Sequence, residues 1–151
     1  MKRLLLSIIA MYLFLGSSLA QITIGTGTST QRQPFGAYFG YERSASIYTS
    51  SEIGVNGTVT TLGWYVGTAN STNIPTKIYL KTTTSSTLTA STWANMISGA
   101  TLVYDATRNY TPTGWLTIDI TDYTYPGDNL LVLCETNYGG GGASSYPLFQ
   151  Y

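Results

Sequence analysis

Seven carboxylate side chains give this sequence its main potential for acid–base chemistry: Glu42, Glu52, Asp105, Asp119, Asp122, Asp128 and Glu135. Two carboxylates held on either side of a glycosidic bond are enough to hydrolyse it. Most of these seven stand beside expected turns or at outward-facing strand positions, where a solvated carboxylate is the ordinary role. The chain has no histidine, which excludes Ser–His–Asp and Cys–His triads and removes the commonest zinc ligand. We therefore expect a protein that is not an enzyme.

Three of the aspartates border the connection between two expected strands and form the one metal site that the sequence suggests. They are Asp119, Asp122 and Asp128, and their hard carboxylate oxygens suit Ca²⁺. Their spacing does not match an EF-hand loop, and aspartate is also common in ordinary turns. We expect the chain to need no cofactor, with calcium at these residues as the alternative to plain turn residues.

Aromatic side chains offer the remaining chemistry, because the chain has 13 tyrosines and three tryptophans. Exposed aromatic rings can stack on sugars, while Thr, Ser and Asn side chains form hydrogen bonds with the hydroxyls. Tyr65 and Trp115 lie on the faces of their strands opposite the aliphatic residues, and Tyr138 and Tyr146 flank the glycine run 139–142. These four are the candidate ligand-binding residues. The alternative is that they only pack, as large aromatics ordinarily do in a β-sandwich.

Apolar and polar residues alternate with a period of two through much of the chain, which predicts β-strands. In the run 77–81, for example, Ile78 and Leu80 share one face and two lysines share the other. The run 130–134 is apolar on both faces, as expected of an interior strand that is covered twice. Further strands are expected at 35–41, 45–48, 58–66, 100–104 and 115–120, with a strand-like run at 146–151.

Turn residues separate these strands and decide the fold class. Asn56-Gly57 and Pro126-Gly127 suit tight turns, and a polar loop is expected over 70–75. Thr92 can cap one short helical turn near Thr92–Ile97, and we expect at most this one. Many short strands joined by turns predict an all-β fold, an antiparallel β-sandwich of the jelly-roll type. Composition is uniform over 21–151, which indicates a single domain.

The first 20 residues have the pattern of an export signal peptide. Lys2 and Arg3 precede an apolar run at 4–15, and small residues stand at 18 and 20. Cleavage there leaves 131 residues with five basic and seven acidic side chains, a formal charge of −2. We therefore expect a secreted or cell-surface protein. The lack of a basic cluster argues against a nucleic-acid partner, and the lack of a second long apolar run argues against membrane insertion of the mature chain.

The single cysteine, Cys134, has no partner within the chain for a disulfide bond. It lies in the apolar run 130–134, away from the exposed and electropositive surroundings that activate a thiol. We expect it to be a small buried side chain.

A series of short motifs resembles, in order and spacing, a module common in secreted and cell-surface proteins of Bacteroidota. The matching residues are Pro34-Phe35, Ile47–Thr49, Ser51–Gly54, Gly57–Leu62, Lys77–Lys81, Trp93, Leu102–Tyr104, Gly114-Trp115 and Asp128–Val132. The resemblance implies a non-catalytic jelly-roll module beside other domains of a larger protein, often exported by the type IX system. It supplies no catalytic residues. The chain stops inside the strand-like run at 146–151, so we expect a fragment truncated at its C-terminus. It also lacks the C-terminal sorting domain of that architecture, which puts type IX export in doubt and again favours a fragment.

Two functions fit these observations. The first is a secreted binding or adhesion module without catalytic activity, whose partner is a glycan or a cell-surface protein. The alternative is a structural spacer that positions the neighbouring domains of a larger secreted enzyme or protease. An enzyme in its own right is the third and least supported hypothesis.

Overall fold

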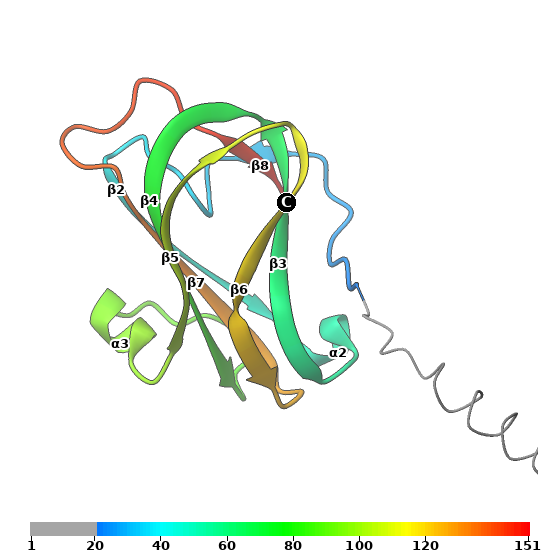
Figure 1. Cartoon of the computed structure of the whole chain (residues 1–151). Coiled ribbons are helices and arrows are strands. Elements are labelled where there is room, and N and C mark those ends of the chain that lie inside the picture. The colour runs from blue at the N-terminus through cyan, green and yellow to red at the C-terminus, as the bar shows by residue number, and fades with distance from the viewer. Residues whose placement is uncertain (1–20) are drawn as a thin grey trace, which may run out of the picture.

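This computed structural model describes residues 21–151. Their strands form two stacked antiparallel sheets (Figure 1). Sheet A contains, in spatial order, β1 (Thr30–Gln31), β8 (Leu148–Gln150), β3 (Gly57–Thr68) and β6 (Gly114–Tyr125). Sheet B contains β2 (Tyr41–Tyr48), β7 (Asn129–Asn137), β4 (Asn70–Thr83) and β5 (Thr101–Tyr110). The predicted all-β antiparallel sandwich is confirmed. The signal peptide predicted over residues 1–20 lies outside the described residues.

The order of the strands is that of a jelly roll. Strands pair in a nested series, β4 with β5, β3 with β6, β2 with β7 and β1 with β8, as in one long hairpin folded over itself. The pairing of β8 with β3 and of β7 with β4 then joins the nested pairs into two sheets. As a result, β5 and β6 are edge strands that run close to each other along one side of the sandwich.

Two short helices accompany the sheets. The helical turn predicted near Thr92–Ile97 is confirmed as α3 (Trp93–Ile97), with the Thr92 hydroxyl accepting the N–H of Asn95. The expectation of at most one helical turn is wrong, because α2 (Ser50–Ile53) follows β2 directly. Thr49 and Glu52 form a reciprocal capping box around this turn. Within residues 21–151, no helix is long and apolar enough to cross a membrane.

Two of the predicted strand boundaries are also wrong. Residues 35–40 form a loop and not a strand, and β2 begins only at Tyr41. The polar segment 70–75, predicted to be a loop, is the first half of β4. It pairs with β5 because Ile74 and Thr76 are buried, while a register shift between Asn70 and Ile74 accommodates the polar residues before them.

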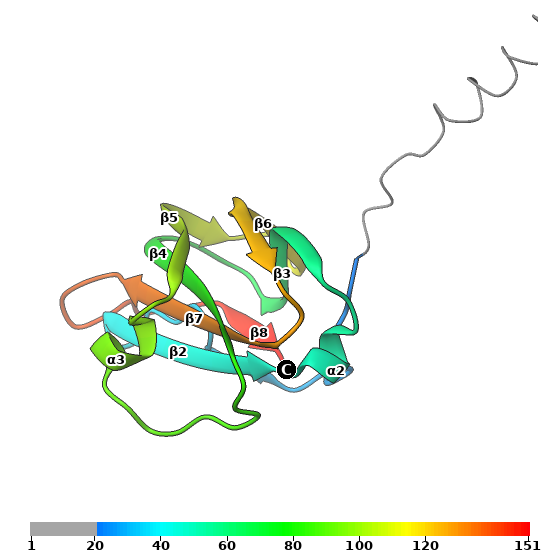
Figure 2. The same cartoon turned by 90° about the horizontal axis from the view of Figure 1, so that it is seen from below.

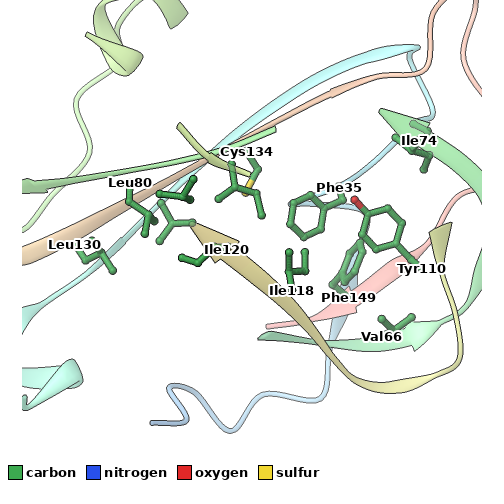
Figure 3. Packing of buried hydrophobic residues seen from close by; sticks show 14 of the residues in the cluster. Phe35, Val66, Ile74, Leu80, Tyr110, Ile118, Ile120, Leu130, Cys134 and Phe149 are labelled. Carbon is green, nitrogen blue, oxygen red and sulfur yellow. The ribbon is translucent and has the colours of Figure 1, made fainter. Parts of the chain in front are cut away.

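An aromatic cluster fills one end of the core between the sheets (Figure 3). Phe35 stacks on Tyr110 with ring centroids 5.1 Å apart and meets Trp64 edge-on at 4.7 Å. The Tyr110 hydroxyl forms a 2.7 Å hydrogen bond with the Thr76 hydroxyl, which satisfies both buried polar groups. Since Phe35 belongs to no strand, its burial fixes the start of the loop that leads into β2.

Strand β7 is buried on both faces, as predicted for the run 130–134. Leu130, Val132 and Cys134 belong to the core between the sheets. Leu131 and Leu133 are buried on the other face, the outer face of sheet B. Figure 2 shows α3 and the chain leading to it beside β2 and β7 on this outer side. The prediction of a buried Cys134 is confirmed, and burial raises the pKa of its thiol.

Candidate binding surfaces

The loop at 35–40 and the glycine loop after β7 are joined by backbone hydrogen bonds. The carbonyl of Gly40 accepts the N–H of Tyr138 at 2.7 Å and the N–H of Gly139 at 3.0 Å. The carbonyl of Ala37 accepts the N–H of Ala143 at 2.8 Å. The sequence placed these two segments 100 residues apart, and the pairing of β2 with β7 brings them to the same end of the sandwich.

Glycines make this close approach of the two loops feasible. Gly142 has a φ of +91°, and a Cβ at that position would overlap the carbonyl oxygen of Tyr38. Gly40 has a φ of +77°, and a Cβ there would lie 2.7 Å from the carbonyl oxygens of both Gly139 and Gly140. Both positions require glycine for backbone conformation and for space. Gly142 and Gly40 therefore hold the glycine run in close contact with the loop at 35–40.

Buried Glu42, the second residue of β2, anchors the loop at 35–40 through its carboxylate. Its carboxylate accepts the Arg32 Nε–H at 2.9 Å and the backbone N–H of Phe39 at 3.3 Å. The same carboxylate occupies the space that a side chain at Gly36 would need. Thr136 donates its hydroxyl to the carbonyl of Gly36 at 2.5 Å. The loop is thus held by hydrogen bonds to the Glu42 carboxylate and to the Thr136 hydroxyl, and by close packing at Gly36. These contacts give Glu42 a structural role.

Five aromatic residues lie on these two loops or next to their ends, and together they are called the aromatic loop surface: Tyr38, Phe39, Tyr41, Tyr138 and Tyr146. Tyr38 packs edge-on against Phe39 at 4.7 Å and against Tyr146 at 5.2 Å between ring centroids. The Arg32 guanidinium lies 4.9 Å from the centre of the Phe39 ring. Four of the five rings are strongly exposed, with exposed fractions of 46% (Tyr38), 60% (Phe39), 57% (Tyr41) and 43% (Tyr138).

The sequence-based candidates Tyr138 and Tyr146 both belong to this surface, but three of its members were missed. The sequence predicts a strand at 35–41, in which alternate side chains are buried, and this prediction hides Tyr38, Phe39 and Tyr41 as candidates. The run Tyr38-Phe39-Gly40-Tyr41 is a signal that could have found them, because a glycine between aromatic residues favours a turn, and a turn exposes its side chains.

Tyr65 and Trp115 lie elsewhere, on the outer face of sheet A, and are called the sheet-face pair. They are direct partners in the register of β3 and β6, and their rings meet edge-on at 5.8 Å and 85°. Their neighbours in sequence, Val66 and Leu116, point toward the core. Trp115 is 57% exposed. The structure therefore divides the four candidates of the sequence between two surfaces.

The three aspartates of the calcium prediction are spread along β6 and the following turn. Asp119 pairs with Thr61 in the sheet, Asp122 is exposed three residues later, and the Asp128 carbonyl accepts the hydroxyl of Tyr125. Across residues 21–151, no three His, Cys, Asp or Glu side chains form a group that could hold a metal ion. The structure does not bring this predicted site together.

Two carboxylates do line one hollow, a shallow depression between the edge strands β5 and β6. Asp105 and Asp119 contribute to its wall, together with Val103 and Ile120. Both carboxylates are exposed, and Asp105 forms a 3.4 Å ion pair with Lys77. A glycosidase acid is normally kept protonated by a buried apolar setting, which this open hollow does not provide.

The fold defines the class of this protein as a two-sheet, all-β jelly-roll sandwich. No protein-family model, curated protein or solved structure matches the chain. The resemblance to a module of Bacteroidota therefore stays an expectation from sequence motifs, and function has to be argued from the two aromatic surfaces.

Proposed function

We propose that this chain is a secreted or cell-surface binding module, without catalytic activity, that recognises a protein partner through the aromatic loop surface. The observation that carries the proposal is a set of five aromatic residues on or next to two loops that share backbone hydrogen bonds. Three of them, Tyr38, Phe39 and Tyr146, pack against one another. Protein surfaces seldom expose so many large apolar groups together unless another molecule covers them. The structural spacer remains the alternative, and the experiment below separates the two.

The composition of this surface favours a protein as the partner. Tyrosine, phenylalanine and arginine are enriched at the centres of protein interfaces, and hot spots are usually aromatic or arginine residues. The glycine loop adds Ser144 and Ser145 between Tyr138 and Tyr146, and loops rich in Tyr, Ser and Gly are typical of antibody combining sites. Phe39 has no hydrogen-bonding group, so its exposed ring gains most from burial against apolar protein side chains.

The loops are also rigid enough to bind without a large loss of conformational entropy. The carboxylate of Glu42 holds Arg32 and the backbone of Phe39, and the Gly40 carbonyl holds the start of the glycine loop. Preorganised loops lose less freedom on binding, and more of the contact energy is then available as affinity. Arg32 is already paired with Glu42, so this surface offers no free positive charge from that residue to a polyanion.

Binding to an array of secreted and cell-surface proteins tests the proposal. The purified chain should bind at least one arrayed protein, and Phe39→Ala should weaken that binding by about tenfold or more, as for a hot-spot residue. Trp115→Ala is the matched control, because it removes an equally exposed aromatic ring from the other surface and should leave this binding intact.

Two outcomes would contradict the proposal. A well-folded chain that binds no arrayed protein would favour the structural spacer. Binding that Phe39→Ala leaves unchanged would show that the aromatic loop surface is not the site of contact.

A further inference from the structure

The outer face of sheet A carries a regular row of residues set by strand register. Three pairs across β3 and β6 face outward at successive positions: Tyr65 with Trp115, Gly63 with Thr117, and Thr61 with Asp119. The residues between them, including Leu116 and Ile118, point into the core. Along the face, the aromatic pair is therefore followed by the Thr117 hydroxyl opposite a glycine, and then by the Asp119 carboxylate opposite the Thr61 hydroxyl.

The Trp115 indole lies next to Gly63 on the outer face of the sheet. A Cβ at Gly63 would be in ordinary van der Waals contact with Cε3 of Trp115, at 3.7 Å, so this position has room for no more than a small side chain beside the ring. Tyr65 supports the indole from the side in an edge-on contact. More than half of Trp115 remains exposed, which leaves a flat aromatic surface open to solvent.

Charge distinguishes this face from the rest of the molecule. The strands of sheet A, as described within residues 21–151, contain no lysine or arginine, and β3 contains no charged residue at all. The strands of sheet B carry all the strand-borne basic residues, Arg43, Lys77, Lys81 and Arg108. A polyanion would find no basic side chain on the strands of sheet A with which to form ion pairs. An uncharged ligand does not need such a partner.

We infer that the sheet-face pair is a binding site for neutral polysaccharide, separate from the aromatic loop surface and independent of its partner. The C–H face of a pyranose ring stacks on the open indole of Trp115, because ring hydrogens are attracted to the negative face of the π-system. The hydroxyls of Thr117 and Thr61 form hydrogen bonds with sugar hydroxyls, and the Asp119 carboxylate accepts them. The row runs along the strands, so it suits an extended chain of several sugar units.

A protein partner is less well matched to this face than to the loops. The sheet-face pair consists of only two aromatic side chains, flanked by glycine and threonine. It lacks the surrounding apolar contacts that exclude water from a hot spot in a protein interface. Neutral hydroxyls and one carboxylate are, by contrast, the groups that a sugar can satisfy. A protein or a second copy of the chain on this face is an outcome that the following test would reveal.

Native gel electrophoresis through soluble polysaccharides tests the inference with the full purified chain. The neutral probes are hydroxyethyl cellulose, mixed-linkage β-glucan, xylan and galactomannan, and the anionic probes are polygalacturonate and heparin. We expect at least one neutral polysaccharide to retard the chain, and neither anionic one. Trp115→Ala should raise the dissociation constant for that polysaccharide about tenfold or more.

Matched variants make the result specific to the site. Trp115→Phe should retain part of the retardation, because an aromatic ring remains. Asp119→Asn should weaken binding to the polysaccharide by a smaller factor. Phe39→Ala, which alters only the other surface, should leave the retardation by polysaccharide as it is in the parent chain. The inference is wrong if no neutral polysaccharide retards the chain, if the anionic probes do so instead, or if Trp115→Ala is retarded like the parent chain. Self-association that Trp115→Ala abolishes would likewise overturn it in favour of a second copy.

Discussion

The aromatic loop surface and the sheet-face pair use the same kinds of side chain but are built by different means. On the loops, Tyr38 and Phe39 meet Tyr146 because glycine contacts, a buried carboxylate and backbone hydrogen bonds join segments 100 residues apart in sequence. On the sheet, two rings meet because β3 and β6 pair in one register. The first surface depends on tertiary packing, and the second on strand pairing alone. They should therefore respond differently to the same kind of change.

Substitution of Gly142 should have the largest effect, and it should fall on the loops. Gly142→Ala combines a positive φ with overlap of the Tyr38 carbonyl, so we expect a loss of at least about 2 kcal/mol in the free energy of unfolding. Urea denaturation measures this loss. Retardation by neutral polysaccharide should persist at temperatures where the variant is folded.

Gly141→Ala is the matched control for that experiment. Gly141 lies in the same loop, has an ordinary φ, and has open space around the position of a Cβ. It should change stability by less than about 0.5 kcal/mol. Equal losses at 141 and 142 would show that the contact with Tyr38 does not matter.

Removal of the Glu42 charge should have the next largest effect. Glu42→Gln leaves the Arg32 guanidinium without its carboxylate partner beneath Phe39, and we expect a loss of about 1–2 kcal/mol, since Arg32 is partly exposed. Glu135→Gln breaks the more exposed pair with Arg43 and should cost less than about 1 kcal/mol. Comparison of the two denaturation curves tests whether the loop anchor is the stronger pair; a reversed order would contradict it.

Alkaline pH should weaken both surfaces together, because they share one core. Burial raises the pKa of Cys134, so the thiol stays protonated in the fold while it ionises in the unfolded chain above a pH of about 8.5. The stability is therefore fully present below that pH and is lost as the pH rises, by up to about 1.4 kcal/mol per pH unit for this group. Cys134→Ala should flatten the decline between pH 9 and 10 in thermal melts. An unchanged slope would mean that other groups, such as the tyrosines, control it.

Calcium should have the smallest effect of all. Because Asp119, Asp122 and Asp128 do not form a group, melting temperatures in a chelator and in millimolar Ca²⁺ should agree within about 1 °C. A clear upward shift in calcium would show that these aspartates serve a metal ion, and it would remove Asp119 from the proposed sugar site.

The same contrast explains how much the sequence could predict. The alternation of residues in the strands placed Tyr65 and Trp115 on an outer face, and it predicted the sandwich, because a period of two fixes which side a residue takes. It could not predict that Tyr38 would meet Tyr146, because that depends on how β2 and β7 align. The helix α2 was missed although its capping box, Thr49 to Glu52, was present in the sequence.

The central claim is that the two aromatic surfaces bind different partners independently. Its most direct test is to measure both activities, binding to an arrayed protein and retardation by neutral polysaccharide, in Phe39→Ala and Trp115→Ala side by side. We predict that Phe39→Ala loses the first activity and keeps the second, and that Trp115→Ala does the reverse. If one variant abolishes both activities while it remains folded, the claim is contradicted.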